Sequence, residues 1–179
     1  YTPDSIVSDG PVSWGNWSPK NYSRSYSGRV NLTSALARSL NTVAVRLAKE
    51  ITTTKVAALA KAMGVESEIS QHKTMSLGTS GMTVLDQATG YLVFATGGFS
   101  GSRHAFSQLS TNTGELLWDF NRDEKKPVRV LSEEASTGMN TMLTAVTEAG
   151  TGRRAQLPGI RVAGKTGTTQ AYRDAWFVG

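Results

Sequence analysis

Residues 32–51 read LTSALARSLNTVAVRLAKEI, and apolar side chains recur in this stretch every three or four positions. The apolar positions are Leu32, Leu36, Leu40, Val43, Leu47 and Ile51. Such a spacing puts these side chains on one face of an α-helix, where they can pack on a core. Taken alone, the periodicity therefore predicts continuous helix from residue 32 to residue 51.

Two more helices are predicted further along the chain. The first ends at Gly64, because glycine commonly follows the last turn of a helix. Its apolar positions are Val56, Leu59 and Met63. The second covers residues 83–95 and is expected to be largely buried. Its predicted buried stripe consists of Leu85, Ala88, Leu92 and Ala95.

A fourth helix and a hairpin are predicted in the second half of the chain. Ser132 is a good N-cap, and the two glutamates that follow it interact favourably with the positive end of a helix dipole. These residues predict a helix that runs to about residue 149. Between the helices, residues 106–110 and 116–120 are strand-like and flank a turn that contains Gly114, which predicts a β-hairpin.

The two ends of the chain differ in character. Residues 161–168 and 174–178 are strand-like, so strands are both inserted among the helices and terminal, and the fold class is α+β. Residues 1–30 are rich in Pro, Ser and Gly and predict a long irregular surface segment. Long loops in compact domains are usually functional. Trp14 and Trp17 in this segment are equally consistent with simple packing on the body of the domain.

Composition limits the classes of function. The 179 residues suffice for one domain with a sizeable core. The net charge is only +5, but residues 151–179 hold five basic residues against Asp174 alone, a local charge of +4 that suits an anionic ligand such as a carboxylate. Basic residues line no helix and do not alternate with aromatic residues, so we expect no nucleic-acid partner.

The lack of cysteine and the isolation of the two histidines exclude thiol chemistry and argue against a metal site. The chain has no cysteine and therefore no disulfide, thiolate nucleophile or thiolate metal site. His72 and His104 are isolated from each other and from carboxylates at a ligand-like spacing, so they are interpreted as surface or loop residues. We expect neither a metal nor another cofactor. Trp176 and Phe177 are interpreted as core residues.

Two short segments carry the side chains that point to chemistry. They are Ser39-Leu40-Asn41 and Lys165-Thr166-Gly167-Thr168. Either segment alone is weak evidence. Ser39 and Asn41 would also serve to cap the second half of the helical stretch, and Lys165 would also serve as an edge-strand lysine that discourages aggregation.

Together and in this order, the two segments resemble two of the three motifs of penicillin-recognising serine enzymes. The flanking residues 31–47, 76–98 and 162–179 resemble the transpeptidase domain of class A, bifunctional penicillin-binding proteins. These are cell-wall synthases with a membrane anchor, a glycosyltransferase domain and a transpeptidase domain. The resemblance implies a β-lactamase/transpeptidase-like fold, here a helical subdomain with an incomplete antiparallel sheet.

The resemblance also implies a role for each motif residue. In the family, a serine attacks the D-Ala-D-Ala peptide and forms an acyl-enzyme. The hydroxyl at Ser39 then relays a proton to the leaving group, the amide at Asn41 holds the substrate backbone, and Lys165 provides a positive charge beside the hydroxyl and the substrate carboxylate.

The remaining motif residues are implied to bind substrate. The hydroxyls at Thr166 and Thr168 help to bind the terminal carboxylate, and the backbone N–H of Thr168 forms half of an oxyanion hole. Gly167 has no side chain, so a ligand can lie against the strand. The implied ligands are peptidoglycan stem peptides and β-lactams, and the implied location of the parent protein is extracytoplasmic.

The motif makes a structural prediction that the periodicity does not. Side chains two positions apart on a helix point about 200° away from each other, so Ser39 and Asn41 converge on one ligand only if the helix breaks between them. We therefore predict two helices, at about 32–38 and 42–51, with a non-helical turn at residues 39–41.

The third family motif, Ser-x-x-Lys with the nucleophile, has no counterpart before Ser39. A formal match, Ser70-Gln71-His72-Lys73, follows Ser39 and lacks an apolar helical stripe that would bury its lysine. We interpret Ser70 as a decoy, so that no nucleophile is present. The chain is then expected to be a partial transpeptidase domain over residues 1–179, truncated at both ends and inactive alone, with unpaired strand edges that favour self-association.

Two other functions share these motifs. A β-lactamase would need a general-base glutamate in a Glu-x-x-Leu-Asn loop, and the sequence contains no such string. A penicillin-sensing binding module without catalysis would carry the same motifs. The run Arg173-Asp174-Ala175-Trp176-Phe177 is more similar to the synthases than to either alternative.

Overall fold

The computed structural model describes residues 1–169 and 173–179. The helices are α1 (Leu32–Ala37), α2 (Asn41–Ile51), α3 (Thr53–Ala62), α4 (Val84–Ala95), α5 (Phe120–Asp123) and α6 (Glu133–Glu148), with 3₁₀ helices η1 (Lys73–Leu77) and η2 (Arg153–Ala155). The strands are β1 (Ile6–Asp9), β2 (Gly28–Asn31), β3 (Gln108–Ser110), β4 (Leu116–Asp119), β5 (Lys165–Thr168) and β6 (Ala175–Val178).

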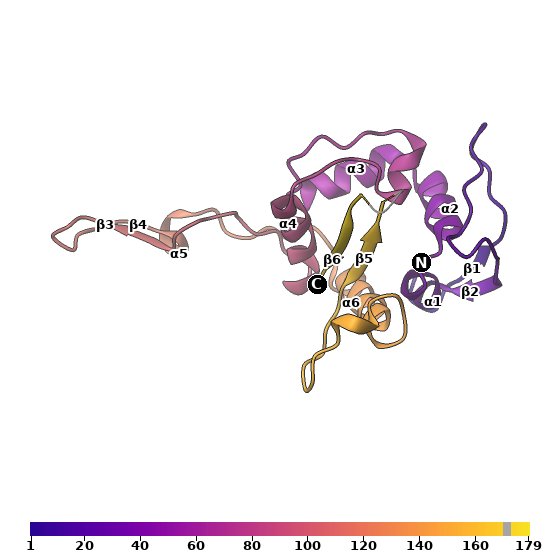
Figure 1. Cartoon of the computed structure of the whole chain (residues 1–179). Helices are drawn as coiled ribbons and strands as arrows, with labels where there is room; N and C mark the ends of the chain where they lie inside the picture. The colour runs from indigo at the N-terminus through magenta and orange to yellow at the C-terminus, as the bar shows by residue number, and fades with distance from the viewer. Residues whose placement is uncertain (170–172) are drawn as a thin grey trace.

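The helices surround one strand pair. In Figure 1, α2, α3 and α4 form an arch over the β5–β6 pair, and α6 lies below it. Helix α6 packs against both α1 and β5, so it joins the start of the chain to its end. The β3–β4 hairpin projects far from this body (Figure 1). Among the described residues, no helix is long and apolar enough to cross a membrane.

The predicted break between the first two helices is confirmed. α1 ends at Ala37, and α2 begins at Asn41, one residue earlier than predicted. The N–H of Ser39 donates to the carbonyl of Leu36, and the N–H of Leu40 donates to the carbonyl of Ala35, both at 3.0 Å. These two bonds form a Schellman motif, in which the residue at the position of Ser39 is usually glycine.

Ser39 accordingly has a left-handed backbone, with φ at 55°. Left-handed geometry costs a non-glycine residue roughly 1–2 kcal/mol because Cβ approaches the carbonyl oxygen. A serine therefore stands at a position where glycine would be more stable. Strained residues of this kind tend to cluster at functional sites.

The prediction of an irregular segment over residues 1–30 is wrong at both of its ends. β1 and β2 form an antiparallel pair, in which Val7 lies opposite Val30 and Asp9 opposite Gly28. The buried side chains of β1 are Val7 and Asp9, and a buried aspartate masks the alternation of apolar and polar residues that marks a strand. Val7 packs with Ala35, Leu40 and Val43 in a small core beneath α1 and α2.

The other local predictions hold with small changes. α3 ends just before Gly64, which has φ at 95°. The hairpin is formed by β3 and β4, and α6 begins after Ser132, whose Oγ accepts from the N–H of Ala135 at 3.2 Å. β5 and β6 are antiparallel and shorter than predicted, because residues 161–164 are not strand. Trp176 is half-buried, but Phe177 is 41% exposed and is not a core residue.

The predicted buried stripe of α4 is wrong, although the helix itself is confirmed. Leu85 and Leu92 are 54% and 41% exposed. They face an open apolar trough beside residues 101–105. The side chains that are buried instead belong to Asp86, Thr89, Gly90 and Val93. Polar residues occupy the inner face because they hydrogen-bond to loops that pack against it, a feature that apolar periodicity does not reveal.

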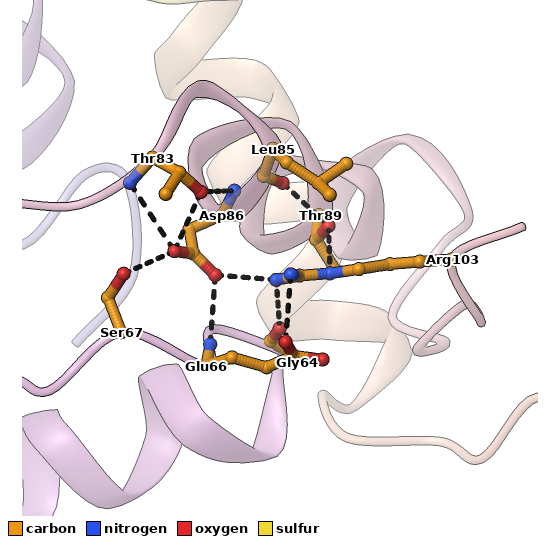
Figure 2. A network of polar contacts seen from close by, with 8 residues as sticks. All are labelled: Gly64, Glu66, Ser67, Thr83, Leu85, Asp86, Thr89 and Arg103. Carbon is orange, nitrogen blue, oxygen red and sulfur yellow. Dashed lines mark hydrogen bonds and ion pairs between the residues drawn. The ribbon is translucent and has the colours of Figure 1, made fainter. Parts of the chain in front are cut away.

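The carboxylate of Asp86 is the centre of that inner face (Figure 2). It accepts from the N–H of Glu66 at 2.9 Å, from the hydroxyl of Ser67, and from Thr83 Oγ1 at 2.9 Å. Arg103 Nη2 donates to it at 2.5 Å. These bonds, led by those from Ser67 and Glu66, lower the pKa of Asp86 far below its usual range.

Arg103 extends the network from α4 to the preceding loop, as Figure 2 shows. Its Nη2 also donates to the carbonyl of Gly64 at 2.9 Å, and its Nε donates to Thr89 Oγ1 at 3.1 Å. Its Nη1 lies 3.1 Å from a carboxylate oxygen of the exposed Glu66. Arg103 thus fixes the base of the segment that leads into the β3–β4 hairpin.

Asp86→Asn is expected to lower the melting temperature at pH 7. The difference in melting temperature from the unchanged chain should become smaller as the pH falls. The folded pKa of Asp86 lies below the unfolded value of 3.8, so its stabilisation is complete above that value and is lost at lower pH. Thermal melts of both proteins from pH 7 to pH 2 measure this narrowing difference. Glu115→Gln, at an exposed site in the hairpin turn, is the control and should leave the melting temperature unchanged. A difference that stays constant with pH would contradict the prediction.

Candidate active site

The structure brings the two sequence motifs together. Lys165 Nζ donates to Ser39 Oγ at 2.8 Å, although the two residues are 126 positions apart. Lys165 is the first residue of β5, and Ser39 lies in the turn between α1 and α2. Ser39 is exposed and Lys165 is half-buried. The contact therefore places a lysine and a serine hydroxyl at the surface, within reach of a ligand.

The side chain of Lys165 is partly removed from water. Burial lowers the pKa of the Lys165 ammonium, because the charged group loses part of its hydration. A second bond from Nζ to the carbonyl of Thr166, at 2.9 Å, helps to fix the position of the amine. An amine with a lowered pKa gives up its proton more readily, which suits a group that exchanges protons with a neighbouring hydroxyl.

The C-terminal end of α6 determines the distance between the two motifs. The N–H of Thr151 donates to the carbonyl of Ala37 at 3.0 Å, which holds the end of α1. Thr151 Oγ1 lies 2.6 Å from Thr166 Oγ1, and the N–H of Gly164 donates to the carbonyl of Leu143 at 3.2 Å. α6 and the residues after it are thereby bonded to both sides of the site.

The side chain of Asn41 does not contact Lys165. Its Nδ2 donates to the carbonyl of Lys20 at 3.0 Å. Of the described hydrogen bonds, none joins this amide to Ser39 or to the residues of β5. Asn41 lies at the start of α2 beside the loop of residues 10–27, with its amide oxygen not engaged by any described partner.

Gly167 and Thr168 form the exposed half of strand β5. Lys165 pairs with Val178 and Thr168 pairs with Ala175 in the β5–β6 ladder. Within residues 1–169 and 173–179, β5 pairs with β6 alone, so its other edge has no strand partner. An extended peptide could add to such an edge by main-chain hydrogen bonds. Residues 170–172, which belong to the third quoted flanking segment, lie outside the described residues.

Ser70 and Lys73 are not arranged as a nucleophile and its base. Lys73 Nζ donates to the carbonyl of Trp14 at 3.0 Å and to Asn16 Oδ1 at 2.7 Å. Ser70 is exposed, and its Oγ accepts from the N–H of His72 at 3.3 Å. This geometry favours the interpretation of Ser70 as a decoy. His72 and His104 are both exposed, and among the described residues no cluster of His, Asp and Glu is placed to hold a metal ion.

Sequence reasoning missed Thr151 and the loop residues that contact α2. Thr151 follows α6 at a position with no local signal, and its partners Ala37 and Thr166 come from different parts of the chain. The amide of Asn21 accepts from the N–H of Thr42 at the start of α2, although the sequence predicts only an irregular surface segment at residue 21. The dipeptide Pro19-Lys20 before it gave no indication of this contact.

The fold and the site define the class of protein. The profile of the penicillin binding protein transpeptidase domain family matches residues 1–179. The chain belongs to this family. Two relatives are named Penicillin-binding protein 1A. The one from Aquifex aeolicus is 36% identical over 94% of this chain, and the one from Neisseria gonorrhoeae is 32% identical over 99%.

Solved structures agree on the fold. Penicillin-Binding Protein 1A from Haemophilus influenzae superposes with a TM-score of 0.84 at 22% identity, over 98% of this chain and 32% of that one. PonA1 from Mycobacterium tuberculosis in complex with penicillin V gives a TM-score of 0.84 at 24% identity, over 98% and 51%. The chain spans 23% of the Aquifex relative and 24% of the Neisseria relative, about a quarter of their length.

Proposed function

We propose that this chain forms the stem-peptide- and β-lactam-binding part of a peptidoglycan D-Ala-D-Ala transpeptidase that works through a serine acyl-enzyme. The observation that carries the proposal is the 2.8 Å contact between Lys165 Nζ and Ser39 Oγ. The parent protein is proposed to be membrane-anchored and extracytoplasmic and to carry a glycosyltransferase domain, in line with relatives named Penicillin-binding protein 1A. The 179 residues are proposed to be one partial domain without activity of their own.

Each motif residue has a chemical task in this proposal. Ser39 Oγ passes a proton between Lys165 and the leaving D-alanine, and Lys165 attracts the terminal carboxylate of the peptide. The hydroxyls of Thr166 and Thr168 donate to the same carboxylate. Asn41 binds the peptide backbone through the amide oxygen that its bond to Lys20 leaves available.

The open edge of β5 receives the extended stem peptide. Gly167 is exposed and has no side chain, so the ligand backbone can approach the strand closely. The backbone N–H of Thr168 supplies one donor of the oxyanion hole. The serine nucleophile is supplied from outside the 179 residues. Ser70 follows Ser39 in the chain instead of preceding it, and the amine of Lys73 is bonded to Trp14 and Asn16.

A binding titration tests the assignment of Lys165. We expect diacetyl-L-Lys-D-Ala-D-Ala to shift the amide NMR signals of residues 39–41 and 165–168. Lys165→Ala should weaken binding about tenfold or more, because a charge-assisted hydrogen bond is lost. Lys61→Ala, at an exposed site on α3, is the matched control and should bind as the unchanged chain does. Equal affinity in both variants would contradict the assignment.

Intact-mass measurement after incubation with excess penicillin tests the origin of the nucleophile. No covalent adduct is expected on this chain, whereas an adduct on Ser70 would show that the decoy interpretation is wrong. In the full-length parent, turnover of fluorescent lipid II supports the transpeptidase. Acylation by penicillin without any turnover would instead support a sensing module.

A further inference from the structure

A buried carboxylate lies behind the turn that carries Ser39. Asp9, at the end of β1, has a side chain with no exposed surface. Its Oδ1 accepts from Asn21 Nδ2 at 2.7 Å and from Thr42 Oγ1 at 2.5 Å, and its Oδ2 accepts from the N–H of Ser27 at 2.8 Å. Among the described residues, no cation forms an ion pair with it. Hydrogen bonds alone compensate for its burial.

Those hydrogen bonds keep Asp9 ionised. Burial by itself would raise the pKa of Asp9, but the bonds from Thr42, Asn21 and Ser27 together lower it. A buried charge that depends on a few donors is intolerant of losing one of them, since the lost donor leaves the carboxylate unsatisfied. The donors are therefore held in fixed positions around Asp9.

Asn21 connects this carboxylate to the start of α2. Leu40 occupies the N-cap position of α2, and its apolar side chain makes no capping bond. The N–H of Thr42, in the first turn, donates instead to Asn21 Oδ1 at 3.2 Å. Asn21 is only 4% exposed, and its Nδ2 donates both to Asp9 and to the carbonyl of Ser25. A residue distant in sequence thus supplies the cap that the local sequence lacks.

The same network reaches the other side of the turn. Arg38, at the C-cap of α1, donates from Nη2 to Ser27 Oγ at 2.6 Å. Ser27 is bonded in turn to Asp9 through its N–H. The residues before and after Ser39-Leu40 are therefore both linked to one buried carboxylate. A left-handed serine persists only where its surroundings determine its conformation from several sides.

We propose that Asn21, held by Asp9, is a positioning residue that fixes the Ser39-Leu40-Asn41 turn in the conformation that binds the stem peptide. Its amide is the only side-chain group in the described network that bonds to Asp9 and to the backbone of α2 at once. The neighbouring carbonyl of Lys20 orients the amide of Asn41. The proposal rests on the proposed function for its ligand, but the conformation of the turn can be measured without any ligand.

The test uses the isosteric variant Asn21→Asp at neutral pH. It keeps an acceptor for the N–H of Thr42 and replaces the neutral amide donor to Asp9 by a second carboxyl group. The two carboxyl groups repel each other when both are ionised and must otherwise share a proton. We expect the amide signals of residues 39–41 to shift or broaden and the affinity for diacetyl-L-Lys-D-Ala-D-Ala to fall about tenfold. Asn21→Ala is the second variant and removes the bonds to Asp9, Ser25 and Thr42 without adding charge. It should give the same result if Asn21→Asp does not fold.

Arg46→Ala is the matched control for loosening of the same loop. Arg46 donates to the carbonyls of Ser8 and Pro11 and so holds the loop without touching the turn. Its removal should leave both the signals of residues 39–41 and the affinity within about twofold. Unchanged turn signals in both Asn21 variants would overturn the positioning role. If the turn signals move but no form of the chain binds the peptide, the positioning role stands and the proposed function fails.

Discussion

Gly150→Ala is expected to lower the free energy of unfolding by about 3 kcal/mol, at the upper end for overpacking a folded structure. A Cβ at this position would lie 2.2 Å from the carbonyl oxygen of Ala37 and 2.8 Å from its carbonyl carbon. These are backbone atoms, so no rotation of a side chain relieves the contact. The end of α6 and the end of α1 must move apart, and the bond from the N–H of Thr151 to Ala37 is lost.

Urea denaturation measures the effect, and Gly138→Ala is its matched control. Gly138 lies within α6, where an added Cβ meets only Pro3 at 3.4 Å, an ordinary contact. Alanine is a better helix former than glycine, so this variant should gain roughly 0.5–1 kcal/mol. Because the end of α1 precedes Ser39, Gly150→Ala should also weaken peptide binding. A stability loss of under about 1 kcal/mol, within the usual range for tolerated core changes, would contradict the predicted contact.

Ser39→Gly is expected to separate stability from function. Relief of the left-handed strain gains about 1–2 kcal/mol, and the greater freedom of glycine in the unfolded chain costs about 0.4–1 kcal/mol, so the net change is a gain of about 0.8 kcal/mol. The hydroxyl that accepts from Lys165 is lost at the same time. In a parent that carries the nucleophile, transpeptidation should fall at least about 100-fold, the usual minimum for removal of a general acid–base group.

Ser34→Gly is the control for the stability measurement. Ser34 lies in the first turn of α1, where glycine should cost roughly 0.5 kcal/mol because it is a poorer helix former than serine. Opposite signs for the two serine-to-glycine changes in urea denaturation would show that the backbone of position 39 favours glycine. A stability loss in Ser39→Gly equal to that in Ser34→Gly would refute the strain argument.

Much of the local structure could be predicted because its signals lie within a few residues of each other. Gly64 ends α3, Ser132 caps α6, and the turn around Gly114 joins β3 to β4, each through bonds between near neighbours. The break at Ser39 is different. Apolar periodicity predicts helix through it, and only the requirement that the motif side chains converge on one ligand predicted the turn.

The face that a helix buries was not predictable for α4. Leu85 and Leu92 follow the helical period but lie on the exposed side, whereas Asp86 and Thr89 are buried against Arg103. Periodicity assumes that the core selects apolar side chains. Here the selection is made by hydrogen-bond donors from the loops before and after the helix, so the assumption fails.

The family, the order of the two motifs and the positions of most helices could be predicted from the amino-acid sequence, since these depend on residue identity and on contacts between neighbours. The pairing of β1 with β2, the burial of Asp9 and the contact of Lys165 with Ser39 became visible in the folded chain alone. Each of these depends on residues far apart in the chain. Such contacts form only when the helices pack, because no local bond can compensate the loss of chain entropy that they require.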